Sequence, residues 1–437
     1  MVSFVVTFFA ADGASHIANK RGRGGDKGET QMQAPKKWIR KWRHPFARNV
    51  VTWATYPFTR FLYGCRPEKF TKENNRPYLI LFNHQTVFDQ FIVQTSFRRP
   101  VYFVGTEDLF SMGIISRIIR FFCAPIPFRK QSADVVSLRT MLKVAREGGT
   151  IALAPEGNIT YSGKTETMRS SIARLVKALK LPVALYRIDG GYGVQPRWSN
   201  AIRKGTIKAG VSRVIEPEEA AGYTDEELYQ LIKSELTVCE ARDDGRRYLS
   251  DHRGEYLERV AYWCPWCGLS SFRSEGNRIT CESCKRTVEY GEDKRLRGVG
   301  CEFPFEWFSD WYDAQQEYIR SLDPARYRDT PLYRDTADLL EVVVYRHKNL
   351  LRKKAGIALY GDRIVIDEGT ERALSLPFSE LAAAALQLRN KLNLQLVADK
   401  LYQIRGGRRF NAVKYINMFY RYQYLHGANR DKQYLGF

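Results

Sequence analysis

The sequence lacks three features that would each define a class of protein. No run of about 18 or more uncharged apolar residues is present, so no conventional transmembrane helix is expected. The apolar start at residues 1–11 has no basic n-region and no convincing cleavage site, which argues against a secretory signal. No Gly-x-Ser-x-Gly sequence occurs, which argues against a serine hydrolase. Any contact with a membrane is therefore expected at its surface.

Acidic residues are the scarcer charged class. The 437 residues include 69 Lys and Arg against 48 Asp and Glu, which gives a formal net charge of +21 and a pI near 9.6. Such an excess predicts a polyanionic partner, which could be nucleic acid, an anionic lipid surface or an acidic substrate. The sign of the charge does not choose among these three.

One segment has no acidic residue at all. Lys36 to Arg66 holds eight Lys or Arg, no Asp or Glu, and many Trp and Phe residues. This composition is typical of helices in a membrane interface, with aromatic rings at the acyl boundary and basic side chains among the headgroups. Pro45 and Pro57 are expected to split the segment into short pieces. The alternative is a basic helix that packs on its own domain.

The chain is too long for a single hydrophobic core, so two or three domains are expected. Residues 14–35 are rich in Gly, Lys and polar side chains, which predicts disorder. The predicted order is a disordered tail at 1–35, basic amphipathic membrane-associating helices at 36–75, an α/β domain at 76–245, a cysteine-bearing module at 255–292, a connector at 293–330 and a β-rich domain at 331–437.

Apolar runs alternate with amphipathic stretches in the α/β region. Each run is short enough for a buried strand, and this alternation predicts a largely parallel sheet with flanking helices. The expected strands are residues 78–82, 101–104, 151–154, 183–188 and 206–211, and the expected helices are residues 135–146 and 168–179.

A histidine and an aspartate follow the first expected strand, in the sequence Asn83-His84-x4-Asp89. Ligand sites in α/β sheets lie beyond the carboxyl ends of the strands. Histidine suits general-base chemistry near neutral pH, and a carboxylate on its second nitrogen fixes its tautomer. The five-residue offset places His84 in the turn and Asp89 in the first turn of the next helix. A purely structural pair is the alternative.

These residues resemble the first motif of the glycerolipid acyltransferases of the PlsC type, the 1-acylglycerol-3-phosphate O-acyltransferase family. The resemblance covers about residues 78–217, and the ordered set of motifs is more specific than any one of them. The later blocks follow in order: Pro127-Phe128-Arg129 resembles the second, Pro155-Glu156-Gly157-Asn158 the third, and Leu181-Pro182-Val183 the fourth. The family's fold implies a glycerolipid-acyltransferase-like sheet.

The resemblance implies an enzyme that moves a fatty acyl group from acyl-CoA or acyl carrier protein to the free hydroxyl of a lysophospholipid. The favoured acceptor is 1-acyl-sn-glycerol-3-phosphate, which would give phosphatidic acid. His84 would remove the hydroxyl proton and Asp89 would stabilise the imidazolium. The alternatives are a different lysolipid acceptor, or a lipid- or nucleic-acid-binding adaptor without catalysis.

The resemblance also implies a substrate-binding set of Asn83, Arg129, Glu156 and Gly157. Arg129 would pair with the acceptor phosphate through its planar fork of donors. Glu156 would position Arg129 or an acceptor hydroxyl, and Gly157 would allow close backbone approach. The chain departs from the family at two positions, with Asn158 where Thr is usual and Phe128 where Asp is usual, and these departures leave the acceptor identity open.

A phosphate-binding loop is a rival interpretation of the third block. The segment from Gly157 to Gly163-Lys164-Thr165 follows an expected strand, as such a loop does. A P-loop needs four residues between its glycines, and this segment has five. Nucleotide hydrolysis is therefore not expected.

Four of the eight cysteines form two C-x-x-C pairs, which are separated by thirteen residues. Paired thiolates at this spacing predict a closed tetrahedral zinc site in a zinc ribbon, structural rather than catalytic, and a reducing cytosol. The expected ligands are Cys264, Cys267, Cys281 and Cys284, while Cys65, Cys123, Cys239 and Cys301 are expected to be ordinary thiols.

The last hundred residues alternate strand-like runs with turns and close with a helix at residues 411–422, which suggests a pleckstrin-homology-like barrel. Nucleic-acid binding is not favoured, because the densest basic stretch lies outside the ribbon and the ribbon itself is bordered by acids. The sequence therefore predicts a peripheral acyltransferase at the cytoplasmic face of an anionic membrane, with a structural zinc ribbon and a β-rich C-terminal domain.

Overall fold

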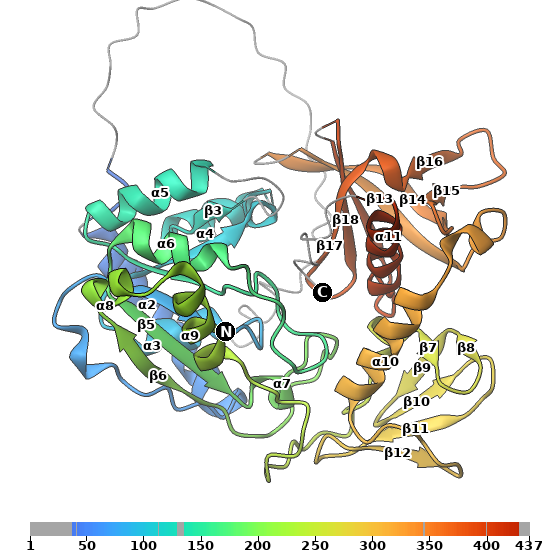
Figure 1. Ribbon diagram of the computed structural model, residues 1–437, viewed down its shortest axis with the longest axis horizontal. Coiled ribbons are helices and arrows are strands. Elements are labelled where there is room, and N and C mark those ends of the chain that lie inside the picture. Colours follow the sequence, from blue (N-terminus) through green and yellow to red (C-terminus); the bar gives the residue numbers. More distant parts are fainter. Residues whose placement is uncertain are drawn as a thin grey trace, which may run out of the picture.

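A computed structural model describes residues 37–427 apart from 41, 112, 129–134, 344–345 and 399 (Figure 1). The tail predicted at residues 1–35 lies outside this range. An N-terminal α/β part, coloured blue to green in Figure 1, lies beside a C-terminal part coloured yellow to red. Along the described residues, the elements of the α/β part come first, the strands that carry the cysteines follow, and a β-rich part comes last.

The α/β part is built on a six-stranded sheet with the order β3-β2-β4-β1-β5-β6. Five strands are parallel, and β6 runs antiparallel to β5. All five expected strands are present, whereas β3 was not expected as a strand. The strands are β1 (Leu79–Phe82), β2 (Val101–Thr106), β3 (Ile126–Phe128), β4 (Thr150–Leu153), β5 (Val183–Asp189) and β6 (Lys208–Ile215).

Helices cover both faces of this sheet. Alternate side chains of β1 enter different cores: Leu79 and Leu81 pack with α5, α6 and α9, while Ile80 and Phe82 pack with α3. This two-sided burial explains why β1 is apolar throughout. The helices are α3 (Asp89–Ser96), α4 (Ile114–Phe122), α5 (Val135–Arg146), α6 (Ser171–Leu179), α7 (Gly191–Val194), α8 (Pro217–Gly222) and α9 (Asp225–Leu236), with 3-10 turns at Thr71–Glu73 and Glu107–Phe110.

The basic N-terminal segment forms one helix, α2 (Arg43–Pro57), followed by a π-helical turn at Phe58–Leu62. The expected break at the prolines is wrong, because Pro45 lies in the first turn, where its missing N–H is not needed, and Pro57 is the last residue. Small and polar side chains of α2 face the protein, while Phe46 and Trp53 are 59% and 73% exposed. Within the described residues, no helix has the length and apolarity to cross a bilayer.

The cysteine-bearing module is a small antiparallel structure. A two-stranded ribbon, β7 with β8, carries the first cysteine pair, and a four-stranded sheet with the order β12-β11-β10-β9 carries the second. The sheet extends to residue 299, beyond the predicted boundary at 292. Its strands are β7 (Trp263–Cys264), β8 (Gly268–Leu269), β9 (Phe272–Glu275), β10 (Arg278–Cys281), β11 (Thr287–Tyr290) and β12 (Leu296–Val299), after a 3-10 turn at Leu257–Arg259.

The C-terminal part is a seven-stranded antiparallel sheet with the order β16-β15-β14-β13-β19-β18-β17, and α11 (Val413–Leu425) packs against it. The final helix was expected, whereas β16 and β17 were not, because the strand-like runs of the sequence are residues 339–345, 356–360, 363–366, 392–397 and 401–404. The strands are β13 (Tyr333–Val343), β14 (His347–Leu359), β15 (Arg363–Ile366), β16 (Leu374–Pro377), β17 (Leu381–Gln387), β18 (Lys391–Leu396) and β19 (Leu401–Gly406), with 3-10 turns at Pro324–Tyr327 and Phe378–Glu380.

The predicted connector is part of a packed core. Helix α10 (Phe308–Ser321) contributes Trp311 and Tyr312 to a hydrophobic cluster that includes side chains of the cysteine module and of the C-terminal sheet. Tyr161 and Trp198 of the α/β part join the same cluster. The Arg197 guanidinium links the two parts of the chain. It donates to Ile159 O of the α/β part at 3.1 Å and to Leu386 O of the C-terminal sheet at 3.1 Å. The C-terminal part is therefore joined to the loop that follows β4.

Candidate active site

The turn between β1 and α3 brings the predicted histidine and aspartate together. His84 follows β1, and Asp89 is the first residue of α3, as the five-residue offset predicted. His84 Nδ1 lies 2.8 Å from Asp89 Oδ2. The same oxygen accepts the backbone N–H groups of Gln85 at 2.6 Å and Thr86 at 2.9 Å, and Asp89 Oδ1 accepts the Thr86 hydroxyl at 2.8 Å. Asp89 is therefore held by four donors.

The two side chains differ in exposure. The Asp89 side chain is fully buried, whereas the His84 side chain is 22% exposed. Among the described residues, His84 makes its side-chain hydrogen bond through Nδ1 only, so Nε2 is available to a ligand. With Nδ1–H donated to the carboxylate, Nε2 carries the lone pair, which is the state a general base requires.

Glu156, in the turn after β4, holds the backbone of the turn between β1 and α3. Its Oε1 accepts the His84 N–H at 2.9 Å, and its Oε2 accepts the Glu166 N–H at 2.9 Å. The Thr160 N–H also donates to His84 O at 3.2 Å. Burial raises the pKa of Glu156 well above its ordinary value, although the two backbone donors oppose this effect. Glu156 thus joins His84 to the loop after β4.

The remaining predicted residues have different surroundings. Asn83 is buried, and its side-chain amide both donates to Ile188 O at 2.7 Å and accepts from Ile188 N at 2.8 Å, which ties β1 to β5. Gly157 is exposed, with a φ of 66° and open space where a side chain would stand. Arg129 lies outside the described residues.

Two residues of the turn were not predicted. Thr86 donates to Asp89 Oδ1 and accepts the Phe88 N–H at 3.1 Å, a role that its hydroxyl at a helix entrance could have indicated. Gln85 is fully buried, and its amide has no hydrogen-bond partner among the described residues. No pattern in the sequence pointed to Gln85.

The four predicted cysteines also come together, far along the chain from this turn. Their Sγ atoms all lie within 4.8 Å of one another, so the group could hold a metal ion. Cys264 and Cys281 are buried and Cys267 is exposed, and all four are free thiols.

Comparison with known proteins identifies the domain that contains the turn between β1 and α3. The acyltransferase family model matches residues 66–187, which contain His84, Asp89 and Glu156. A similar solved structure is the 1-acyl-sn-glycerophosphate acyltransferase PlsC from Thermotoga maritima, with 19% identity and a TM-score of 0.37 over 44% of this chain and 76% of that one. No curated protein matches the chain. Residues 66–187 therefore form a domain of the acyltransferase family, and the chain is an acyltransferase, as its sequence motifs predicted.

Proposed function

We propose that this acyltransferase moves a fatty acyl group from acyl-CoA or acyl carrier protein to the free hydroxyl of a lysophospholipid, with 1-acyl-sn-glycerol-3-phosphate as the favoured acceptor. The observation that carries the proposal is the His84–Asp89 pair at the carboxyl end of β1, in which Asp89 occupies Nδ1 and Nε2 is left for a substrate. The matched family supports acyl transfer, and the motif order supports a glycerolipid acceptor.

The proposed reaction uses His84 as a general base. Nε2 takes the proton of the acceptor hydroxyl as the oxygen attacks the thioester carbonyl carbon. The tetrahedral intermediate then collapses, the carbon–sulfur bond breaks, and the imidazolium returns its proton to the leaving thiolate. Asp89 stabilises the imidazolium through its hydrogen bond to Nδ1, and three further donors hold its side chain in position. General-base assistance contributes about a hundredfold to ten-thousandfold.

Asn83 and Glu156 are proposed to position the turn. Both oxygens of Glu156 accept backbone N–H groups, and both polar atoms of the Asn83 amide bond to Ile188. Neither side chain has a free acceptor directed at a lysolipid by these contacts. Gly157 remains the residue of this set with room for substrate at its backbone. Arg129 is still proposed for the acceptor phosphate.

We place the enzyme at the cytoplasmic face of a membrane, as a peripheral protein. Helix α2 supports this, because Phe46 and Trp53 on its outward face and Trp42 at its N-cap are exposed, while Ala47 and Thr55 on its inward face are buried. Large apolar side chains on the exposed face of a basic helix suit the boundary between headgroups and acyl chains. An anionic surface also suits the excess positive charge.

The cysteine cluster is proposed to bind one structural zinc ion. Four thiolates about 2.3 Å from zinc at the corners of a tetrahedron lie about 3.8 Å apart. Cys264 Sγ lies 3.7 Å from Cys284 Sγ, and Cys267 Sγ lies 3.6 Å from Cys281 Sγ, so the arrangement fits. With four protein ligands the ion would have no open position, and it would stabilise the ribbon without joining the reaction.

The C-terminal part is proposed to be a pleckstrin-homology-like domain. Its strands form two antiparallel runs, β13 to β16 and β17 to β19, that meet at the β13–β19 pair, and α11 closes the sheet. This order of seven strands and a final helix supports the pleckstrin-homology-like barrel that the sequence pattern suggests.

An assay of the purified full chain tests the proposed function. Lysophosphatidic acid and other lysophospholipids would each be offered with acyl-CoA and with acyl carrier protein as donor, and product would be measured by mass spectrometry. Acylation of lysophosphatidic acid in preference to acceptors without the phosphate monoester is expected. Transfer only to a different lysolipid would mean that the proposed acceptor is wrong. No transfer with either donor would contradict the proposed function as a whole.

A further inference from the structure

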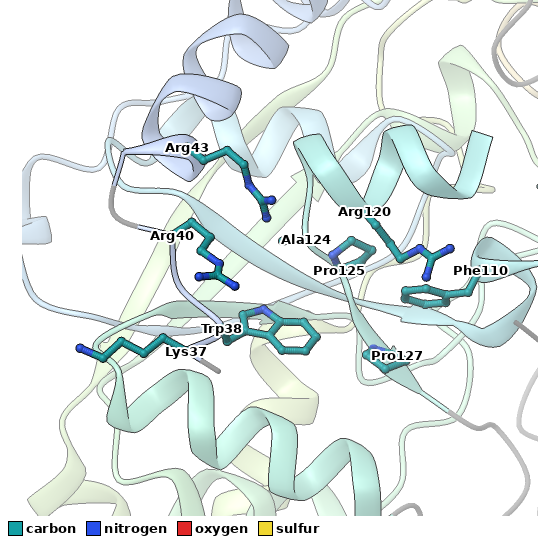
Figure 2. A pocket seen from close by; sticks show the side chains of 9 residues that line it. All are labelled: Lys37, Trp38, Arg40, Arg43, Phe110, Arg120, Ala124, Pro125 and Pro127. Atoms are coloured by element: carbon teal, nitrogen blue, oxygen red, sulfur yellow. The ribbon is translucent and has the colours of Figure 1, made fainter. Parts of the chain in front are cut away.

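A basic pocket lies at the edge of the α/β sheet, next to β3 (Figure 2). Its volume is about 430 Å³, and it is lined by Lys37, Arg40, Arg43 and Arg120 together with apolar side chains that include Trp38. No described acidic residue lines it. Figure 2 shows the Arg40 and Arg43 guanidinium groups above the Trp38 ring, while the Arg120 guanidinium lies beside Phe110 and the Lys37 side chain extends away. The pocket combines apolar walls with several positive charges.

Arg43 is held in place by its neighbours. Its Nη2 lies 3.0 Å from His44 Nε2, and its guanidinium lies over the Phe121 ring at 5.0 Å. His44 Nδ1 lies 2.8 Å from the Tyr102 hydroxyl. Burial, with the charges of Arg43 and Arg40, lowers the pKa of His44 to about 4, so the ring is neutral and can accept from Arg43 at Nε2. Arg43 is therefore oriented before any ligand arrives.

The positive charge in this pocket has no carboxylate partner among the residues that the structure describes. Among the described residues, none of the four cations forms an ion pair with a carboxylate, and Arg120 donates through Nε to Ser116 O at 3.3 Å. Among the described residues, the Arg40 guanidinium and the remaining N–H groups of Arg43 and Arg120 are available to a ligand. Arginine forks bind phosphate through paired, charge-assisted hydrogen bonds. The ligand chemistry that fits is a phosphate joined to an apolar body.

The pocket lies between two helices with exposed apolar side chains. Trp42 and Phe46 belong to the α2 segment, while Ile114 and Phe121 belong to α4, which packs against α2. Trp42 is 75% exposed and Ile114 is 71% exposed. Side chains of this kind enter the acyl boundary of a bilayer, where lipid phosphates lie just above them. A lipid in that layer would present its phosphate to the pocket.

The pocket is separate from the catalytic pair. In the strand order β3-β2-β4-β1, the pocket strand β3 and the His84 strand β1 are three positions apart. At about 4.8 Å between neighbouring strands, this offset is about 14 Å. The pocket and the catalytic pair therefore lie at different strands of the sheet. The pocket cations, which are Lys37, Arg40, Arg43 and Arg120, are also different from Arg129, the residue proposed for the acceptor phosphate.

We propose that this pocket binds the phosphate headgroup of an anionic membrane lipid, such as phosphatidic acid, and so docks the α2–α4 surface on the membrane. The lipid is a docking ligand and is not consumed. The inference rests on the membrane location proposed above but not on the identity of the acceptor. It adds α4 to the membrane contact, which the sequence assigned to residues 36–75 alone.

Vesicle binding by the full chain tests this proposal without any acyl donor. The vesicles are phosphatidylcholine with a minor fraction of phosphatidic acid. The pocket variant is Arg43→Gln with Arg120→Gln, and the matched control is Arg60→Gln with Arg117→Gln, which removes two charges from the same two regions outside the pocket. The pocket variant should lose at least about tenfold more affinity than the control, since it also loses charge-assisted hydrogen bonds.

Further arms of the experiment distinguish the sources of phosphate. Replacing Arg43 and Arg120 by Lys keeps the charge without the forks and should give an intermediate loss, while thermal unfolding verifies that each variant is folded. Soluble short-chain phosphatidic acid should displace the wild-type protein from vesicles, and inorganic phosphate at the same concentration should not.

Three results would overturn the proposal. Equal losses in the pocket variant and the control would mean diffuse attraction to the surface. Equal displacement by inorganic phosphate would mean a site for free phosphate. Loss of monomeric lysophosphatidate binding by the pocket variant, with vesicle binding intact, would make the pocket part of the acceptor site. Because no turnover is measured, failure here is distinct from failure of the acyl-transfer proposal.

Discussion

The proposed chemistry at the end of β1 depends on two side chains with different surroundings. Asp89 is enclosed by donors from residues 84–86, so its orientation is determined within a single turn. His84 is partly exposed and keeps one ring nitrogen for substrate. The contacts around His84 are local, and Glu156 anchors its backbone. Removing the His84 ring should therefore abolish catalysis while the protein stays folded.

His84→Ala should lower acyl transfer by about a hundredfold to ten-thousandfold, because the general base is lost. Asp89→Asn should also act mainly on kcat, since an amide can accept from the histidine but cannot stabilise the imidazolium. Steady-state kinetics with the preferred lysolipid measure both effects. If the two variants instead lost activity in proportion to their folded fraction by circular dichroism, the pair would be structural.

Glu156→Gln should reduce kcat through the position of His84. An amide can replace only one of the two carboxylate oxygens, so one of the N–H groups of His84 and Glu166 loses its acceptor, at a cost of about 1–3 kcal/mol. The matched control is Glu73→Gln, because buried Glu73 likewise accepts two backbone N–H groups, those of Arg98 and Arg99.

Both variants should lower the melting temperature. Only Glu156→Gln should lower kcat by more than its loss of folded protein accounts for. An equal effect of the two on kcat would assign Glu156 to stability alone.

At the scale of elements, α2 presents its large side chains to the outside. A helix that only packed on its own domain would bury its aromatic rings, whereas His44, Ala47 and Thr55 are the buried residues of α2. The sequence left both interpretations open, and the orientation of the helix favours the membrane interface.

Phe46→Ser with Trp53→Ser should weaken binding to anionic vesicles by about tenfold or more for each residue, because burying such a side chain contributes about 1.5–3 kcal/mol. Sedimentation with vesicles measures the loss. Tyr424→Ser with Leu425→Ser, which changes exposed apolar residues at the end of α11, is the control. A comparable loss in the control would place the membrane contact on the C-terminal part.

The cysteine module should contain about one zinc ion per chain. Cys281→Ser should remove the metal and unfold the ribbon locally, since metal binding contributes directly to the folding of such modules. Elemental analysis and limited proteolysis provide the readouts. Cys239→Ser, at an exposed cysteine outside the cluster, should keep both the bound metal and the resistance of the ribbon to proteolysis. Wild-type protein without zinc after cytosolic production would contradict this prediction.

At the scale of the molecule, buried groups join the parts. Glu240 is buried and accepts the N–H groups of Gly190 at 2.7 Å and Tyr192 at 2.9 Å, while its own carbonyl accepts Lys294 Nζ from the cysteine module at 2.8 Å. Burial raises the pKa of Glu240 from 4.5 to about 8, against the opposing effect of the Gly190 donor. This carboxyl is therefore protonated at neutral pH in the folded chain and ionised in the unfolded chain.

The free energy of unfolding should fall as pH rises from about 4.5 to about 8, because the folded state binds the additional proton in this window. Glu240→Gln should make the fall shallower, since the amide does not titrate. Urea unfolding at several pH values measures the slope. Glu317→Gln, at an exposed position, should keep the wild-type slope, and an unchanged slope in Glu240→Gln would contradict the assignment.

Several parts of the fold could be read from local patterns. The five expected strands and the two expected helices of the α/β part are present, and α5 has the predicted bounds. The strands that the sequence did not predict share a cause, which is that tertiary packing outweighs the local secondary-structure propensity of their residues. Strand β3 is only three residues long and contains Pro127, and β17 has four consecutive alanines yet pairs with β18 under α11.

The sequence by itself determined the His84–Asp89 spacing, the cysteine pairs and the acid-free segment, because each is a relation between residues close along the chain. Only the tertiary structure decided that Glu156 holds the His84 backbone, that α2 turns its aromatic residues outward, and that Arg43 and Arg120 share a pocket. Those relations join segments far apart in sequence. They depend on how the sheet orders its strands and on which face each helix buries, and no local pattern encodes either.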